Sequence, residues 1–349
     1  MRKFVYSLMT DKTRNPLTAP LKFILWLCSL IYASAVWALA KGYEKNFFTS
    51  YKADPKVISI GNITVGGTGK TQAAIMVAKA LEARRRRVAV LIRGYGADEC
   101  RMLQEELSDV PILVGPDRVK SSKRAFYDFG SDTAILDDGF QHHKIGRDLD
   151  IVLLDATNPF GNGQLLPRGI LREPLKALKR ADVIIITKVD FKGAALGGIY
   201  AELAKLGKDK DALEAVYEPL GFRNIYDETR LLGPDMISGK KICLVSSIAN
   251  PAYFRQNIIN LGGQIELEFA FMDHYEYKER DFKKIDRECS FLGVDFTVVT
   301  KKDAVKIKRL ASAGSLCVPI LVFDVDFKII KNKQVLDDRL SGLYTGKVL

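Results

Sequence analysis

The chain has 349 residues, of which 47% are hydrophobic and 27% charged, and its formal net charge is +11. These proportions exclude an intrinsically disordered chain, and the length is enough for two domains with substantial cores. The excess of Lys and Arg comes without a DNA- or RNA-binding motif, which argues against nucleic acid as the partner. The five cysteines are scattered without a CxxC pair or a Cys/His spacing, which argues against a zinc site and a disulfide framework and fits a reducing cytoplasm.

The N-terminal sixth of the chain is basic and apolar. Residues 1–56 hold nine Lys or Arg against three Asp or Glu, and the stretch from Leu17 to Ala40 carries the single charge of Lys22. This stretch is about long enough to cross hydrocarbon and longer than the apolar core of a signal peptide. Basic residues flank it on both sides, so a spanning helix and a helix lying in the interface both stay open, with a buried core helix as the alternative. We expect residues 1–50 to form a membrane-associated helical segment.

From Lys56 onward, short apolar runs alternate with helical patterns, as in VISIGN (57–62), TQAAIMVAKALEAR (71–84), VAVLIRGYG (88–96), DIVLLDA (150–156) and DVIIITK (182–188). Strands without polar alternation, separated by helices, predict a parallel sheet covered on both faces. The same alternation of short apolar runs and helical patterns returns after residue 235. We therefore predict an α/β protein, with a P-loop NTPase-type parallel-sheet domain over residues 51–234, linker included, and a second, smaller α/β domain over 235–349. The basic run 84–87 is expected in a solvated loop, with lipid contact as the alternative.

A glycine-rich loop lies between the first predicted strand and helix. In a P-loop, backbone N–H groups turn onto phosphate oxygens, a Lys neutralises the β- and γ-phosphates and a Ser or Thr hydroxyl ligates Mg²⁺. The loop predicts binding of a nucleotide with Mg²⁺, although Thr64 stands where the strict pattern has glycine. The predicted nucleotide-binding residues are Thr64, Val65, Gly66, Gly67, Thr68, Gly69, Lys70 and Thr71.

An acidic pair follows the apolar run TAIL in the sequence DDGFQHH (137–143). A strand that ends in carboxylates beside a P-loop is where a Walker-B-type residue holds or orients Mg²⁺. Because Asp137 and Asp138 are adjacent, at most one is expected to point directly at the metal, and the other either supports it or caps the turn. His142 and His143 are either functional or hydrogen-bonded loop residues.

Several motifs in order along the chain resemble the tetraacyldisaccharide 4′-kinases of lipid A biosynthesis. They are GNITVGGTGKT (61–71), RGYG (93–96), VGPDRV (114–119), LDDGFQHH (136–143), FGNGQLLPRGILREPL (160–175), SIANP (247–251), MDHYEY (272–277) and TKKDAVKI (300–307). The resemblance implies transfer of the γ-phosphate of ATP to the 4′-hydroxyl of an acylated glucosamine disaccharide 1-phosphate, giving a lipid A precursor of the lipid IVA type. It also implies a catalytic body on the cytoplasmic side of the inner membrane, with the lipid surface as a partner. The sequence names no protein partner.

The same resemblance implies roles for individual residues. The catalytic pair falls on Asp98 and His274, where an Asp oriented by a His would accept the proton of the sugar hydroxyl. With these residues in the first and second predicted domains, domain closure would assemble the pair. Cys100, Pro116, Tyr275 and Lys301 depart from the family's usual pattern. The candidate Mg²⁺ ligands are Thr71, Asp137, Asp138 and Glu99, and the candidate substrate or phosphate contacts are Gln141, His142, Arg168 and Arg172.

Two alternatives stay open at this point. TKVD (187–190) after a buried strand is similar to the guanine-reading segment of P-loop GTPases, so a GTPase or metallochaperone-like NTPase is the second candidate function. For Arg172, a phosphate contact through its guanidinium group competes with a surface ion pair to the neighbouring Glu173.

Overall fold

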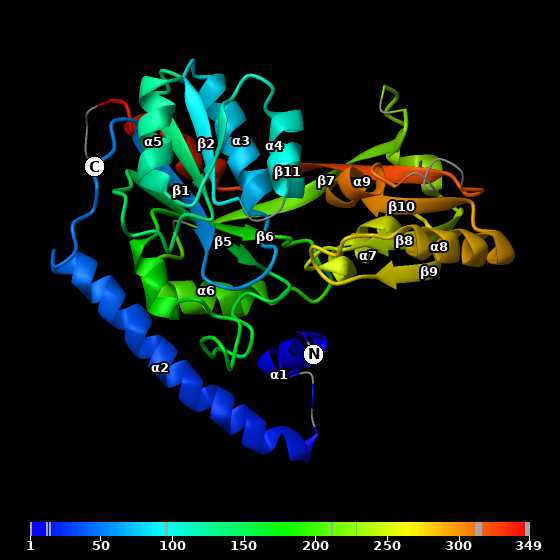
Figure 1. Ribbon diagram of the computed structural model, residues 1–349, viewed down its shortest axis with the longest axis horizontal. Helices are drawn as coiled ribbons and strands as arrows, with labels where there is room; N and C mark the ends of the chain where they lie inside the picture. The colour runs from blue at the N-terminus through cyan, green and yellow to red at the C-terminus, as the bar shows by residue number, and fades with distance from the viewer. Residues whose placement is uncertain are drawn as a thin grey trace. The chain divides into compact units, whose positions relative to one another are not determined.

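The structure is a computed structural model that describes residues 2–11, 13, 15–94, 97–210, 212–227, 229–310 and 316–345, with residues 2, 3 and 97–99 described by their backbone alone (Figure 1). The chain divides into two compact units. The P-loop unit comprises Met1–Gly94, Leu107–Val216 and Ile329–Leu349, and the second unit comprises Tyr95–Glu106 and Tyr217–Lys328. Two strands, β7 and β11, each begin in one unit and end in the other.

The P-loop unit is built on parallel strands in the order β3-β2-β4-β1-β5-β6-β7. Ile58 of β1, for example, lies between Ile135 of β4 and Leu149 of β5. Strands β2, β4 and β6 are buried at every position, so both faces of the sheet are covered. This confirms the α/β, P-loop NTPase-type fold that the continuous apolar runs predict. The strands are β1 (Lys56–Asn62), β2 (Val88–Ile92), β3 (Ile112–Val114), β4 (Thr133–Asp137), β5 (Leu149–Asp155), β6 (Val183–Thr187) and β7 (Ala212–Asn224); β11 (Ile320–Lys331) lies mostly in the second unit and ends in this one.

Helices cover this sheet with their small and branched apolar side chains. Helix α3 contacts β1, β2 and β4 and buries Ala73, Ala74 and Val77 against them. Ile199 and Leu203 of α6 join a cluster with Leu178 of η2 and with β5 and β6. The helices of this unit are α1 (Arg2–Met9), η1 (Pro16–Thr18), α2 (Ala19–Glu44), α3 (Lys70–Glu82), α5 (Arg118–Tyr127), η2 (Leu175–Arg180), α6 (Leu196–Lys205) and α10 (Lys333–Gly342).

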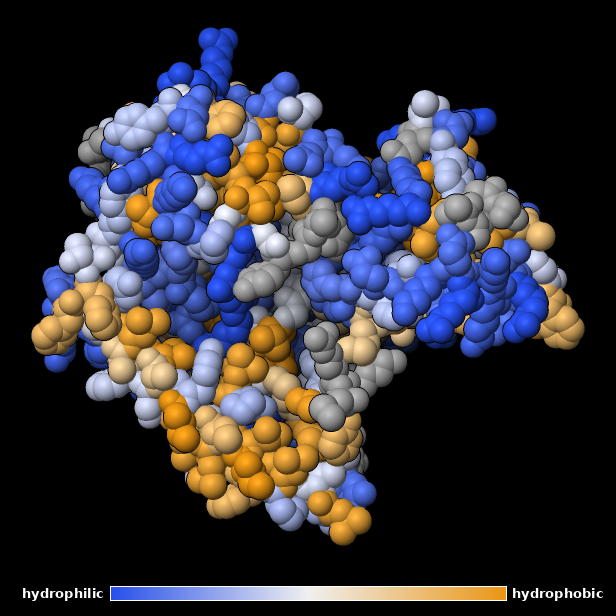
Figure 2. Space-filling model, viewed as in Figure 1, coloured by the Kyte–Doolittle hydropathy of each residue, from blue (hydrophilic) through white to orange (hydrophobic). Residues whose placement is uncertain are grey.

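The N-terminal apolar stretch forms one long helix, the blue α2 of Figure 1. With η1 it runs from Pro16 to Glu44, has a mean hydropathy of 2.0 in its most apolar window and is long enough to cross a membrane. Only 6% of that window is buried, so the alternative of a buried core helix is wrong. Apolar side chains gather on the surface over these N-terminal helices, as Figure 2 shows in orange. The exposed apolar residues of α1, η1 and α2 include Phe4, Leu17, Phe23, Ile24, Leu30, Ile31 and Trp37.

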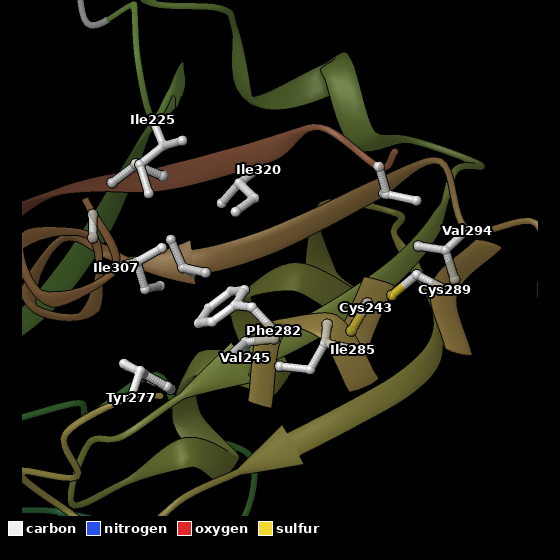
Figure 3. Packing of buried hydrophobic residues seen from close by; sticks show 14 residues of the cluster. Ile225, Cys243, Val245, Tyr277, Phe282, Ile285, Cys289, Val294, Ile307 and Ile320 are labelled. Atoms are coloured by element: carbon white, nitrogen blue, oxygen red, sulfur yellow. The ribbon is translucent and has the colours of Figure 1, made fainter. Parts of the chain in front are cut away.

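The second unit has its own parallel strands, in the order β11-β10-β8-β9. One core of this unit lies between β8 and α8, where Phe282 and Ile285 of the helix lie beside Cys243 and Val245 of the strand (Figure 3). The elements of this unit are α4 (Ala97–Glu106), η3 (Pro234–Ile237), β8 (Lys241–Ser246), α7 (Pro251–Asn260), β9 (Gln264–Ala270), α8 (Glu279–Leu292), β10 (Phe296–Thr300) and α9 (Lys301–Ile307).

The two compact units have other boundaries than the predicted α/β domains 51–234 and 235–349. Helix α4 clusters with the second unit because it packs on α9, where Glu106 and Lys301 form an ion pair. The C-terminal helix α10 clusters with the P-loop unit because Asp337 pairs with Arg84 and Tyr344 bonds to Thr133. Two arginines of the basic run 84–87 therefore contact the C-terminal segment. Arg84 pairs with Asp337, and the Arg86 guanidinium lies 3.8 Å from the centre of the Tyr344 ring.

Candidate active site

The P-loop connects β1 to α3 and leaves open space where phosphates would bind. Gly66 and Gly69 have φ values of 121° and 96°, in a region that L side chains rarely adopt, and Gly69 is the N-cap of α3. A Cβ atom added to Gly66 would meet no heavy atom within 4 Å. The loop thus presents an uncrowded backbone at the N-terminus of a helix, the arrangement that binds phosphate groups.

A second segment, residues 164–172, is bonded to the start of the P-loop, and we call it the strap. Val65 N–H donates to the carbonyl of Ile170 (2.8 Å), and Arg172 N–H donates to the carbonyl of Ile63 (2.7 Å). Thr64, buried between these bonds, forms an antiparallel bridge with Leu171 of the strap. This pairing explains why a threonine can replace the usual glycine, because β-branched residues favour extended pairing.

The acidic pair at the end of β4 meets the P-loop through two separate contacts. Thr71 Oγ1 donates to Asp137 Oδ2 (3.0 Å), and the Asp137 side chain is buried. Asp138 has a left-handed backbone with φ of 58°, and its Oδ1 lies 3.7 Å from Lys70 Nζ. Asp137 therefore contacts the hydroxyl of Thr71, and Asp138 lies near the ammonium group of Lys70.

Arg172 of the strap completes the environment of Asp138. Its Nη1 donates to Asp138 Oδ1 (2.7 Å) and to Asn62 Oδ1 (3.3 Å). Burial would raise the pKa of Asp138, but the charges of Lys70 and Arg172 outweigh burial and hold that pKa below its usual range. Arg172 pairs with Asp138 rather than with its neighbour Glu173, whose carboxylate pairs with Arg180 (2.9 Å).

Polar side chains from the end of β6 and the residue after it bond to the P-loop backbone. The sequence alone did not identify them as site residues. Thr187 Oγ1 donates to the carbonyl of Thr68 (3.1 Å), and Lys188 Nζ donates to that of Gly67 (3.0 Å) while pairing with Asp155. These contacts place the start of the TKVD segment against the P-loop. The positive φ of Lys188 (59°) and its burial follow from this role, which a four-residue motif alone does not reveal.

Arg118 is the other functional candidate that sequence reasoning missed. It is 3% exposed, and its guanidinium donates to the carbonyls of Gly115 (2.6 Å) and Asp137 (3.3 Å). A buried arginine stays protonated, so it places a fixed positive charge behind the acidic pair. The motif VGPDRV could have indicated this residue, because Asp117 is the N-cap of α5 and Arg118 is the first residue of that helix.

Gln141 and the two histidines lie in the loop after the acidic pair. Gln141 Nε2 donates to Glu173 Oε1 and to the carbonyl of Asn62, both at 2.9 Å. Burial and the charges of nearby arginines lower the pKa of both histidines, that of His143 to about 4. His143 stacks on Tyr43 of α2, with ring centres 5.5 Å apart, so it packs against the C-terminal end of that helix.

Arg168 is held by the N-terminal helices. Its Nη2 donates to both carboxylate oxygens of Asp11 (2.9 and 3.0 Å), and its Nη1 donates to the carbonyl of Leu8 (3.1 Å). The structure therefore places this arginine in a contact between α1 and the strap. A role in contacting substrate or phosphate stays a prediction.

His274 lies in the second unit, in the loop between β9 and α8. Its φ is 59°, and its Nε2 lies 3.4 Å from Lys302 Nζ in the first turn of α9. Helix α4, which carries Asp98 and Glu99, packs on the same α9. Asp98 and His274 thus belong to one unit and not to the two predicted domains, although the side chains of Asp98 and Glu99 lie outside what the structure describes.

A buried network beneath the His274 loop joins three of the sequence motifs. The fully buried Asp303 carboxylate accepts hydrogen bonds from Ser247 N–H (3.1 Å), Tyr277 OH (2.9 Å) and Thr300 Oγ1 (2.7 Å), and also from Ser247 Oγ. Lys306 Nζ donates to Ser247 Oγ (2.9 Å) and to the carbonyl of Tyr275 (3.3 Å). Burial and the Asp303 charge raise the pKa of Tyr277 well above its usual range. The network holds the part of the loop that follows His274, through the Tyr275 carbonyl and the Tyr277 hydroxyl.

The chemistry of the P-loop unit fits a nucleoside triphosphate with Mg²⁺. Lys70 and the uncrowded backbone at Gly66 suit phosphate oxygens, while Thr71 and Asp137 supply two adjacent oxygen ligands. Among the described side chains, no group of three or more His, Cys, Asp or Glu residues forms a metal cluster. One or two carboxylates are enough for Mg²⁺ when phosphates complete its coordination.

Comparisons with known proteins agree on one family. A family model described as tetraacyldisaccharide-1-P 4′-kinase matches residues 21–344. The tetraacyldisaccharide 4′-kinase of Anaeromyxobacter sp. (strain Fw109-5) is 37% identical over 339 residues, covering 89% of this chain and 90% of that protein. The protein of the same name from Syntrophus aciditrophicus (strain SB) is 32% identical over 346 residues, covering 90% and 91%. A crystal structure of LpxK from Aquifex aeolicus in complex with ATP has a TM-score of 0.69 at 25% identity, covering 93% of this chain and 99% of that one.

Proposed function

The chain belongs to the tetraacyldisaccharide-1-P 4′-kinase family and is a kinase, and we propose that it transfers the γ-phosphate of ATP to the 4′-hydroxyl of a tetraacyldisaccharide 1-phosphate. The observation that carries this proposal is the convergence of Lys70, Thr71, Asp137 and Asp138 at the N-terminus of α3. The family match over residues 21–344 favours a kinase over the GTPase alternative.

The P-loop residues would position the triphosphate and neutralise its charge. Lys70 and Arg172 both pair with Asp138, and we infer that these two cations contact the phosphates when the nucleotide binds. Thr71 and Asp137 would hold Mg²⁺, which supplies Lewis-acid stabilisation of the developing charge on the phosphate oxygens. Asp138 would orient Lys70 and Arg172, and Arg118 adds a fixed positive charge behind the pair.

The acceptor hydroxyl needs a group that takes its proton. We assign this role to Asp98 with His274, following the family motifs RGYG-ADE and MDHYEY. The left-handed backbone of His274 and its contact with Lys302 support a functional role, since such backbone conformations occur often at active sites. The packing of α4 and the His274 loop against one helix, α9, supports a shared role for the two residues.

The substrate's acyl chains require the enzyme to work at a lipid surface. The exposed apolar side chains of α1 and α2 and the basic residues on both flanks suit an anionic membrane face (Figure 2). We therefore propose that the chain acts at the inner membrane, with its catalytic body on the cytoplasmic side. Spanning and interfacial placement of α2 both agree with this.

Turnover with defined substrates tests the proposal. Purified full-length protein is incubated with MgATP or MgGTP, with and without tetraacyldisaccharide 1-phosphate in mixed micelles, and the phosphorylated lipid and free phosphate are quantified. We expect lipid phosphorylation that depends on ATP, Mg²⁺ and the acylated acceptor. Nucleotide hydrolysis that prefers GTP and ignores the lipid would instead establish the GTPase alternative.

A further inference from the structure

Two polar side chains on one face of α2 bond to the strap. Ser29 is 4% exposed, although α2 is otherwise largely solvent-exposed and apolar. Ser29 Oγ accepts from Arg168 N–H (3.0 Å), and its single proton is shared between the carbonyls of Leu165 in the strap (3.0 Å) and Leu25 in α2 (2.9 Å). Tyr32, one turn further along, donates from its hydroxyl to the carbonyl of Arg172 (3.0 Å). A helix that served only as an apolar anchor would need neither contact.

The charged residues before α2 reinforce the same attachment. Asp11, which follows α1, accepts hydrogen bonds from Lys22 Nζ (2.8 Å), Asn162 Nδ2 (3.0 Å) and the Arg168 guanidinium. Burial alone would raise the pKa of Asp11, but these three partners lower it well below its usual range. Because this carboxylate stays ionised, the N-terminal segment is bonded to both α2 and the strap over the whole physiological pH range.

The strap is also bonded to the start of the P-loop and to the acidic pair. The backbone of Arg172 is fixed at both ends, since its N–H bonds to Ile63 of the P-loop and its carbonyl accepts from Tyr32. The guanidinium of the same residue reaches Asp138. A continuous set of hydrogen bonds therefore runs from α2 through the strap to the acidic pair, entirely within the P-loop unit.

We propose that Ser29 and Tyr32 are positioning residues, through which the N-terminal helix sets the placement of Arg172 at the phosphate site. The inference rests on the proposed kinase activity at the P-loop. It makes α2 part of the scaffold of the active site as well as its attachment to lipid. A loss of these contacts should then slow phosphoryl transfer even when the enzyme remains fully bound to membranes.

The test compares full-length S29A/Y32F with the wild type and with S34A as the matched control. Ser34 lies on an exposed part of α2, and its hydroxyl bonds to Leu30 of the same helix. The substitutions remove hydroxyls without lowering hydropathy, so binding to vesicles of phosphatidylethanolamine and phosphatidylglycerol should be unchanged. We expect kcat with micellar tetraacyldisaccharide 1-phosphate to fall about tenfold in the double variant, the factor expected from one or two lost hydrogen bonds. S34A should match the wild type.

Hydrogen exchange of the substrate-free protein gives a readout that does not depend on activity. We expect the amides of residues 163–172 to exchange about tenfold faster in the double variant, because Arg168 N–H loses its acceptor and the strap loosens. Unchanged exchange, unchanged kcat or a kcat loss that parallels lost vesicle binding would each overturn the inference. If the wild type fails to phosphorylate the acylated disaccharide, the proposed function fails, whereas faster exchange would still establish the contact itself.

Discussion

Replacing Asp303 with Asn should destabilise the second unit strongly. The carboxylate is fully buried and accepts from four donors, which are the backbone N–H of Ser247 and the hydroxyls of Ser247, Tyr277 and Thr300. An amide of the same shape keeps one acceptor oxygen and turns the other into an NH₂ donor. At least one hydroxyl then faces a donor, and the buried Lys306 ammonium loses the nearby negative charge.

The size of the effect follows from these contacts. A hydrogen bond to a charged group contributes about 1.5–3 kcal/mol, and the removal of one charge from a buried polar network costs about 3–5 kcal/mol. We therefore expect Asp303→Asn to lower the free energy of unfolding of the second unit by about 3–5 kcal/mol. Because the network holds Tyr275 and Tyr277, which follow His274 in the same loop, kcat should also fall in the part of the population that remains folded.

Urea unfolding followed by circular dichroism, with hydrogen exchange on peptides covering residues 241–307, measures this change. Asp326→Asn is the matched control, since Asp326 is exposed on the same unit and its substitution should change stability by less than about 0.5 kcal/mol. A loss below about 1 kcal/mol for Asp303→Asn would refute the reasoning, because it would mean that the network contributes little or relaxes freely.

Three other expectations concern the phosphate site, the proton acceptor and pH. Lys70→Ala and Thr71→Ala should each remove most lipid kinase activity with an unchanged melting temperature, and full turnover in folded Lys70→Ala protein would exclude the P-loop role. Asp98→Ala and His274→Ala should each lower kcat by about two to four orders of magnitude, with the double variant scarcely worse, whereas multiplicative losses would indicate independent roles. The pKa of His143 is lowered to about 4, so the folded state binds fewer protons than the unfolded state, and stability should fall as pH drops from about 6.5 toward about 4. His143→Gln should flatten that part of the pH profile in thermal melts, and an unaltered profile would contradict the assignment.

The sequence by itself determined the features that depend on neighbouring residues. Continuous apolar runs predicted the buried parallel strands, because a strand covered on both faces has no polar side to alternate with. The P-loop was equally readable, since Gly66, Gly69, Lys70 and Thr71 act through the backbone of one turn between β1 and α3. The long apolar helix was also recognisable from its length and composition.

Only the tertiary structure decided which residues from distant segments meet. Arg172 lies 34 positions from Asp138, and its choice of partner depends on how the strap pairs with Ile63 and Val65. The guanidinium of Arg168 bonds to Asp11, 157 positions away, and α4 joins the second unit through α9. Charged side chains carry little periodic signal, and one arginine can satisfy many acceptors equally well. The partner it takes is fixed by the packing of the chain around it, which is a property of the whole fold and not of the local sequence.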